Sequence, residues 1–211
     1  MGRFMSGLFI TLEGTEGAGK SSLVKVVKDY LEGLNRRVIC VREPGGTPIA
    51  EDMRAILKTV RSDDELCPKA ELILMYAARA QLVETLIKPK LAEGYDVVCD
   101  RHDLSTVAYQ GGGRGIPFST LDMMRQVALG DFRPDLTLLL DVDPVVGMQR
   151  ARSRGSLDRF EQSEMDFFVR VRNTYLKCAE KHPDKIKVID ASVDQQSVTR
   201  EALKILESLV C

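Results

Sequence analysis

The segment Gly14–Ser21, which reads GTEGAGKS, constrains the fold of this chain more than any other feature. It directly follows the apolar run 8–12 and opens the stretch 20–34, where apolar residues recur at the three-four spacing of an amphipathic helix. A strand before such a loop and a helix after it allow successive backbone N–H groups to turn inward around an anion. Lys20 then adds a positive charge for the phosphates, and the Ser21 hydroxyl can reach a bound magnesium ion. The context predicts a nucleoside triphosphate site rather than an ordinary glycine turn.

Short apolar runs alternate with longer helical patterns along the chain. The expected strands are 8–13, 38–42, 96–100, 136–142 and 186–190. The expected helices are 20–34, 49–60, 69–92, 119–129, 144–153, 161–181 and 195–209. This alternation predicts an α/β fold whose parallel sheet has crossover helices on both faces. With 211 residues and no linker-like segment, we expect a single domain, 1–211.

Two segments interrupt the pattern. Pro89 lies inside the helical stretch 69–92 and is expected to bend or end that helix. The stretch 111–117, which reads GGGRGIP, is expected to be flexible, either as a mobile connection or as a surface loop.

Charge and composition argue against several classes of partner. The formal net charge is −1, so the chain lacks the global basic field that attracts proteins to nucleic acid. No apolar run approaches the roughly 18 residues that cross a bilayer. Gly2 and Ser6 match the loose myristoylation pattern, but one acyl chain anchors poorly. The five cysteines are scattered and include no C-x-x-C pair, which fits reduced thiols. We therefore expect no nucleic-acid or membrane partner and a cytoplasmic location.

Ionisable residues gather where the expected strands end. In open parallel sheets ligands bind at the carboxyl ends of the strands, so these positions are candidate site residues. Glu13 precedes the glycine-rich loop, and Asp100 ends the run DVVCD, where phosphate-binding enzymes place a magnesium-linked carboxylate. Either residue could hold water on the metal or orient a substrate hydroxyl, and the sequence leaves both roles open.

Arginines outside the loop suggest that two phosphate groups are brought together. Donor and acceptor phosphates repel each other, so a phosphoryl-transfer site surrounds both with cations. Arg79 lies in a helical pattern, Arg101 follows a strand, and the segment 150–159 reads RARSRGSLDR. Arg79 could be a solvated helix residue and Arg101 a surface ion pair. The segment 150–159 could be a solvated or nucleic-acid-binding face, although a lid that closes over phosphates is favoured.

Other nucleotide-dependent classes agree less well with the sequence. A GTPase switch usually has D-x-x-G and N-K-x-D motifs; the chain has two asparagines, Asn35 and Asn173, and neither is followed by lysine. A motor ATPase typically needs a larger core. A small-molecule kinase suits the length and the arginines, with another P-loop nucleotide or nucleoside kinase as the alternative.

Several further motifs resemble those of the bacterial thymidylate kinases, over nearly the whole chain. They are REPGGT at 42–47, AARAQ at 77–81, DRHDLSTVAYQ at 100–110, GDFRPDL at 130–136 and the arginine-rich 150–159. The resemblance implies a three-layer P-loop kinase fold with five parallel strands and an arginine-rich lid at about 150–160. It also implies phosphorylation of dTMP to dTDP with ATP and Mg²⁺, and a homodimer.

The resemblance also assigns roles to individual positions. The residues expected to hold the ATP phosphates are Gly14, Thr15, Glu16, Gly17, Ala18, Gly19, Lys20, Ser21 and Ser22. Those expected around dTMP are Glu13 near the sugar, Arg79 and Arg101 on the phosphate, and Met75, Ser105, Thr106, Tyr109 and Gln110 around the nucleoside. Those expected to act in transfer are Lys20, Arg101, Arg152 and Arg154, with Ser21 and Asp100 on the metal. Tyr109 is expected to exclude a ribose 2′-hydroxyl. Met75 departs from the pattern, because several members have a phenylalanine there that stacks on thymine.

Overall fold

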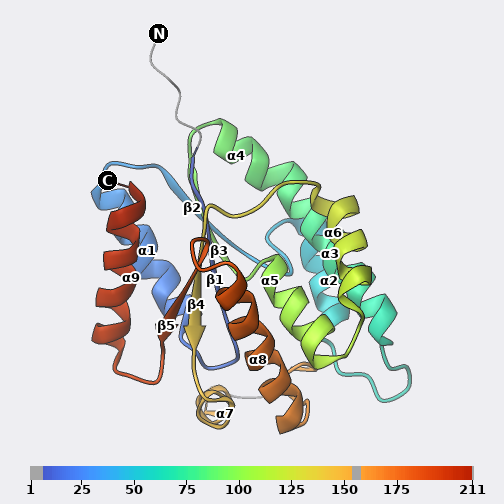
Figure 1. Ribbon diagram of the computed structural model, residues 1–211. Coiled ribbons are helices and arrows are strands. Elements are labelled where there is room, and N and C mark those ends of the chain that lie inside the picture. The colour runs from blue at the N-terminus through green and yellow to red at the C-terminus, as the bar shows by residue number, and fades with distance from the viewer. Residues whose placement is uncertain (1–6, 154–157, 211) are drawn as a thin grey trace.

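A five-stranded sheet forms the centre of the molecule. The computed structural model describes residues 7–153 and 158–210. All strand pairs within them are parallel, and the strand order is β2-β3-β1-β4-β5 (Figure 1). The strands are β1 (Phe9–Gly14), β2 (Val38–Arg42), β3 (Asp96–Asp100), β4 (Leu136–Asp141) and β5 (Ile186–Asp190). The predicted α/β fold with a parallel sheet is confirmed.

Helices connect these strands and cover both faces of the sheet. The helices are α1 (Lys20–Gly33), α2 (Pro48–Lys58), α3 (Pro68–Leu82), α4 (Lys88–Ala92), α5 (Asp103–Thr106), α6 (Phe118–Leu129), α7 (Pro144–Arg152), α8 (Met165–Lys181) and α9 (Gln195–Val210). Two π-helical segments, η1 (Val83–Ile87) and η2 (Val107–Gly113), continue α3 and α5. Most bounds lie close to those expected from the sequence. The exceptions are α8, which begins at Met165 rather than at residue 161, and α5 with η2, which the periodicity did not indicate.

The two faces of the sheet have separate apolar cores. Successive side chains of a strand point to opposite faces, so neighbouring residues of β1 belong to different cores. Ile10 and Leu12 pack with Leu23 of α1, and α9 completes that face. Phe9 packs with Leu82 of α3 on the other face, near η1. Figure 1 shows α1 and α9 together on one side of the sheet and α3, α6 and α8 on the other.

The strand order brings polar chain ends to one edge of the sheet. Leu12 of β1 is in register with Asp100 of β3, and Asp100 is in register with Arg42 of β2. Because all the strands are parallel, the residues after β1, β2 and β3 leave the sheet at the same edge. These positions are far apart along the chain, but the sheet places them side by side, at the edge where ligands bind in such folds.

The stretch 69–92 is a continuous helical rod rather than a helix that ends at Pro89. The α-helix α3 widens into the π-helical η1 before α4, whose first turn contains Pro89. Proline lacks the N–H that would bond to the preceding turn, and a π-helical turn is one way to accommodate that loss. The expected end of the helix at Pro89 is therefore wrong: the chain stays helical through residue 92 with a local change of helix type.

The stretch 111–117 also differs from its expected flexibility. Gly111 and Gly113 are buried at the end of η2, which packs against α8. A Cβ atom on Gly112 would lie 2.0 Å from the Thr174 hydroxyl oxygen of α8. At this position glycine permits close packing of two helices, so its presence indicates backbone approach rather than mobility.

Candidate active site

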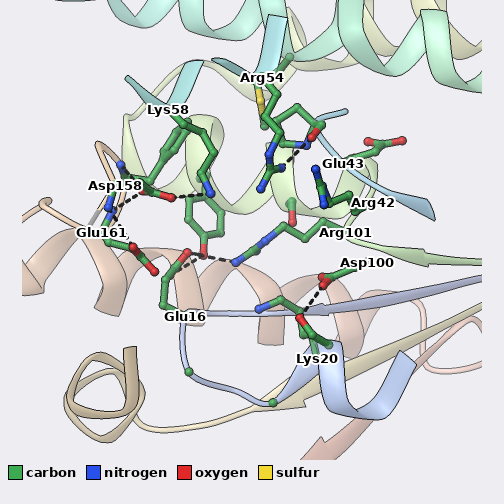
Figure 2. A pocket seen from close by; sticks show the side chains of 18 of the residues that line it. Glu16, Lys20, Arg42, Glu43, Arg54, Lys58, Asp100, Arg101, Asp158 and Glu161 are labelled. Atoms are coloured by element: carbon green, nitrogen blue, oxygen red, sulfur yellow. Dashed lines mark hydrogen bonds and ion pairs between the residues drawn. The ribbon is translucent and has the colours of Figure 1, made fainter. Parts of the chain in front are cut away.

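A cavity of about 400 Å³ opens at the carboxyl edge of the sheet. Residues from the glycine-rich loop, the end of β2, α2, the turn after β3, η2 and the segment after residue 157 form its wall. The basic side chains of the wall are Lys20, Arg42, Arg54, Lys58, Arg101 and Arg150. The acidic ones are Glu16, Glu43, Asp100, Asp158 and Glu161. Figure 2 shows the cationic ends of Arg42, Arg54, Lys58 and Arg101 pointing into the same space from different elements. Such a wall suits a polyanionic ligand.

Close backbone packing fixes the conformation of the glycine-rich loop. Gly17 has a φ of 69°, and a Cβ atom there would lie 2.0 Å from the backbone oxygen of Gly147 in α7. Only glycine fits both the left-handed conformation and this approach. Gly19, with a φ of 91°, caps α1 without a side-chain hydrogen bond. The loop therefore presents the N-terminus of α1 to the cavity, where the helix dipole favours negative charge.

Lys20 lies in this loop with its charge buried. Its Nζ atom donates to the backbone oxygens of Gly14, at 3.0 Å, and Thr15, at 2.7 Å. Burial lowers the pKa of Lys20 to about 8, and the neighbouring Arg101 guanidinium acts in the same direction. A bound anion beside Nζ would favour the charged form of Lys20 again. The lysine that is expected to bind phosphate is therefore held in place by the backbone of its own loop.

Ser21 and Asp100 meet at the start of α1. The Ser21 hydroxyl donates to Oδ2 of Asp100, at the end of β3, at 3.1 Å. A hydroxyl and a carboxylate oxygen are ligands that Mg²⁺ accepts, together with phosphate oxygens and water. No group of three or more His, Cys, Asp or Glu side chains able to hold a metal occurs in the residues that the structure describes. In the chemistry of its donors, the Ser21–Asp100 pair fits a magnesium ion.

Arg101 connects the loop with the wall opposite it. The residue has a φ of 70°, a left-handed conformation that is uncommon outside glycine and that often marks functional sites. Its guanidinium donates to Oε1 of Glu16 at 3.0 Å and to the backbone oxygen of Gly14 at 3.0 Å. The Tyr109 hydroxyl lies 2.7 Å from both carboxylate oxygens of Glu16. Glu16 is therefore a hydrogen-bond acceptor in the wall of the cavity.

Glu13 supports this arrangement from below. Its carboxylate accepts hydrogen bonds from the backbone N–H groups of His102 and Ser105 and from the hydroxyls of Ser105 and Tyr175. Burial raises the pKa of Glu13, and these donors partly offset the shift. Within the described part of the chain, the cavity wall does not include Glu13. The structure places Glu13 under the turn that carries Arg101, and its expected contact with a substrate sugar stays a prediction.

Arg79 is buried and pairs with acidic residues of the protein, and its expected contact with a substrate phosphate stays a prediction. Its side chain is 1% exposed, and its Nε donates to Oε2 of Glu43 at 2.6 Å. Nη2 donates to the backbone oxygen of His102 at 3.1 Å, and Asp103 lies 3.6 Å from Nη1. Among the described residues, Glu43 belongs to the cavity wall and Arg79 does not. A buried guanidinium requires such compensation, and here the compensation comes from acidic residues of the protein.

The residues expected around the nucleoside are brought together, with one exception. Met75 of α3, Ser105 of α5, and Tyr109 and Gln110 of η2 all belong to the cavity wall. Thr106 is fully buried, and it is not among the described residues that line the cavity. The unexpected π-helical turn of η2 thus carries two of these residues. π-helical turns are frequent at functional sites.

Comparison with known proteins decides the family. The family model described as thymidylate kinase matches residues 12–202. The chain belongs to the thymidylate kinase family.

Relatives agree over almost the whole length. A thymidylate kinase of Shewanella loihica is 51% identical over 203 residues, which cover 96% of each chain. One from Photobacterium profundum is 49% identical over 204 residues, covering 96% of this chain and 97% of its own. The crystal structure of thymidylate kinase from Ehrlichia chaffeensis superposes with a TM-score of 0.76 at 32% identity, covering 95% of this chain and 99% of that one. Membership of the thymidylate kinase family identifies the chain as a kinase.

The arginine-rich segment of this thymidylate kinase family member is divided among several environments. Arg150 lines the cavity and donates to the backbone oxygen of Ala191 at 3.0 Å. Arg152 is exposed at the end of α7, outside the described cavity wall. Arg154 lies outside the residues that the structure describes. Arg159 turns toward α2 and donates to the backbone oxygen of Leu57 at 2.8 Å.

Sequence reasoning missed the basic side chains of α2. Arg54 and Lys58 both line the cavity, and Lys58 pairs with Asp158 at 2.6 Å. Arg54 donates to the backbone oxygen of Pro44, whose peptide bond with Glu43 is cis. The spacing of four residues on an expected helix was the available signal, since it places both side chains on one face. Arg42, which ends β2, was noted only as part of a motif.

A second cavity, of about 350 Å³, lies on the other side of the glycine-rich loop. It shares Gly17, Gly19, Ser22 and Arg150 with the first cavity. Its remaining wall comes from the start of α1 and from the segment between β5 and α9, through the first turn of α9. The loop thus separates two spaces that both reach it.

No helix of the described residues is long and apolar enough to span a membrane.

Proposed function

We propose that this chain transfers the γ-phosphoryl group of ATP to dTMP and so produces dTDP and ADP. The observation that carries the proposal is that Lys20 of the loop and Arg101, Arg42, Arg54 and Lys58 from other elements face one cavity. Two bound phosphate groups repel each other, and these cations offset that repulsion while the reacting atoms are held in line.

The two cavities that share the loop support separate places for donor and acceptor. In our proposal the nucleoside of ATP lies in the second cavity, beside the segment that leads into α9, and its phosphates follow the loop past Lys20. The shared residues Gly17, Gly19 and Ser22 favour this path, because a chain of phosphates can run along them from one space to the other.

The acceptor lies in the larger cavity in this proposal. Arg101 is its phosphate ligand, and Met75, Tyr109 and Gln110 surround the nucleoside. Glu16 already accepts a hydrogen bond from the Tyr109 hydroxyl, so it can accept one from a sugar hydroxyl as well. The Tyr109 ring also takes up space beside that position, which favours a deoxyribose.

In this proposal Ser21 and Asp100 would hold a Mg²⁺ ion beside the phosphates. When bound, it neutralises charge on the phosphates. The chain itself supplies Lys20 and the arginines, which orient the reactants and stabilise the negative charge that spreads over the transferred group.

The reaction needs little acid–base chemistry from the protein. An oxygen of the dTMP phosphate forms the new bond to phosphorus while the bond between that phosphorus and the bridging oxygen of ATP breaks. The attacking oxygen is already anionic, so no strong general base is required. Arg152 and Arg154 remain predicted to act from the lid, and closure of that segment would exclude water as a competing acceptor.

An ADP-release assay with a panel of acceptors tests the proposal. The panel contains dTMP, dUMP, dCMP and thymidine, each with ATP and Mg²⁺. We expect dTMP to give the highest kcat/KM; a preference for thymidine or for another monophosphate would refute the assignment. Lys20→Ala should lower turnover by orders of magnitude, whereas Lys25→Ala, at an exposed position of the same helix, should not. A chain without acceptor-dependent ADP release would be a nucleotide-dependent regulator instead.

We also propose that the chain forms a homodimer, as the resemblance implies. The helices α2, α3 and α6 pack side by side. Their exposed apolar residues are Ile49, Ile56, Ile73, Phe118, Met123 and Val127. Covering these side chains with a second copy would remove them from water. Light scattering after gel filtration tests this: we expect twice the chain mass, and a monomer at every concentration would refute it.

We place the protein in the cytoplasm. Cys40, Cys67, Cys99 and Cys178 are free within the described residues, which suits a reducing compartment. Fractionation of cells of the source organism would test this location.

A further inference from the structure

Glu71 connects the base end of the cavity with the segment that follows the arginine-rich stretch. The residue lies in the first turn of α3, and its side chain is 1% exposed. Its Oε1 accepts a hydrogen bond from Nε2 of Gln110 at 2.7 Å. Its Oε2 faces Nη2 of Arg159 at 2.7 Å and Nη2 of Arg114 at 3.4 Å. One carboxylate oxygen therefore accepts from Gln110, and the other faces two guanidinium groups.

This arrangement determines which end of the Gln110 amide is available. A carboxylate accepts hydrogen bonds and does not donate them, so Gln110 has to turn its NH₂ group toward Glu71. The other end of the amide, Oε1, is buried and has no hydrogen-bond partner among the residues that the structure describes. Gln110 itself belongs to the wall of the cavity. The wall thus presents an acceptor that a ligand could satisfy, and leaving it unpaired is costly.

We propose that Glu71 is a positioning residue that sets the base specificity of the cavity by holding the Gln110 carbonyl oxygen toward the base. This inference rests on the proposed function. The ring N3 of thymine and uracil carries a hydrogen and donates to a carbonyl oxygen. The N3 of cytosine carries a lone pair at the same place, which repels that oxygen. The pair Glu71–Gln110 therefore selects pyrimidines with an N3–H group.

The substitution Glu71→Gln reverses this logic. The new amide has only one oxygen, and the guanidinium groups of Arg159 and Arg114, which face Oε2 of Glu71 in the wild type, attract that oxygen rather than the NH₂ group. Its NH₂ group then faces Gln110, which must turn its own oxygen toward residue 71 and its NH₂ group toward the base. The wall changes from an acceptor into a donor, while the shape of the cavity stays nearly the same.

The ratio of kcat/KM for dTMP to that for dCMP measures the effect. We expect Glu71→Gln to lower this ratio at least about tenfold, because one mismatched hydrogen bond replaces a matched one. Arg114→Gln is the matched control. It removes one guanidinium from the same carboxylate but keeps the acceptor for Gln110, so its ratio should stay within about threefold of the wild-type value.

A ratio that is unchanged in a folded Glu71→Gln protein would overturn the inference. If that variant does not fold, the double variant Glu71→Gln/Arg114→Gln replaces it. This variant removes one of the two cations that would otherwise face a neutral side chain, and we expect the same fall in the dTMP-to-dCMP ratio. The wild-type protein gives an independent test with N3-methyl-dTMP, which lacks the hydrogen. Equal use of dTMP and the methylated analogue would also overturn it. Absence of dTMP turnover in the wild type, by contrast, would refute the proposed function itself.

Discussion

Binding of ATP beside Lys20 is expected to take up a proton in mildly alkaline solution. Burial lowers the pKa of Lys20 to about 8 in the free protein, so the side chain is about half charged at pH 8. A triphosphate next to Nζ favours the charged form and should return the pKa to its ordinary value of 10.5 or above. At pH 9 the free side chain is then about one-tenth protonated and the bound one almost fully, so about 0.9 proton enters per nucleotide. At pH 7 the same reasoning gives about 0.1 proton.

Titration calorimetry measures this uptake directly. The apparent binding enthalpy of a non-hydrolysable ATP analogue with Mg²⁺ is recorded in two buffers with different ionisation enthalpies, at pH 7, 8 and 9. The slope between buffers gives the number of protons. Burial raises the pKa values of Tyr109 and Tyr175 well above their ordinary range, so both phenols stay protonated in this window.

Lys20→Arg is the control, since a guanidinium stays charged throughout this range. Its proton uptake should not grow with pH. An uptake in the wild type that stays below about 0.2 proton at pH 9, or an equal rise in Lys20→Arg, would refute the assignment of the proton to Lys20.

Three further substitutions test other parts of the site. Tyr109→Ala should raise the use of ribo-TMP relative to dTMP, and an unchanged ratio of kcat/KM values would contradict its steric role. Glu43→Gln should destabilise the fold by about 3–5 kcal/mol in urea titrations, because it leaves the buried Arg79 without its main partner. The pKa of Glu43 is lowered in the folded state, so its contribution to the free energy of unfolding is present at neutral pH and is lost as the pH falls below about 4.5. The difference in the free energy of unfolding between wild type and Glu43→Gln should therefore shrink in acid. Arg152→Ala should lower kcat more than dTMP affinity, whereas a loss confined to affinity would argue against contacts made during transfer.

Much of the fold could be predicted because its signals are local. The strand over 38–42 and the loop 14–21 are each defined by neighbours a few positions away. The same holds for the apolar face of α1, which repeats every three or four residues. These patterns were enough for the α/β class and for a glycine-rich loop at the edge of the sheet.

Helix types and packing distances were not readable in the same way. The π-helical turn η2 carries Tyr109 and Gln110, yet its glycines read as a flexible stretch. Their meaning depends on α8, whose side chains pack against η2 from more than fifty positions along the chain, as in the bond from Arg170 to Gly113. Sequence composition alone does not distinguish a glycine that permits motion from one that permits contact.

The sequence by itself determined which charged, hydroxyl and amide groups this protein has at the ends of its strands. Only the tertiary structure decided which of those groups line the cavity and which are paired in the interior. Arg79 pairs with Glu43 across 36 positions, and Gln110 is oriented by Glu71 across 39. A buried charge or amide takes the partner that packing brings to it, because leaving it unpaired costs more than any local preference supplies. Such partners come from distant segments, and folding alone brings them together.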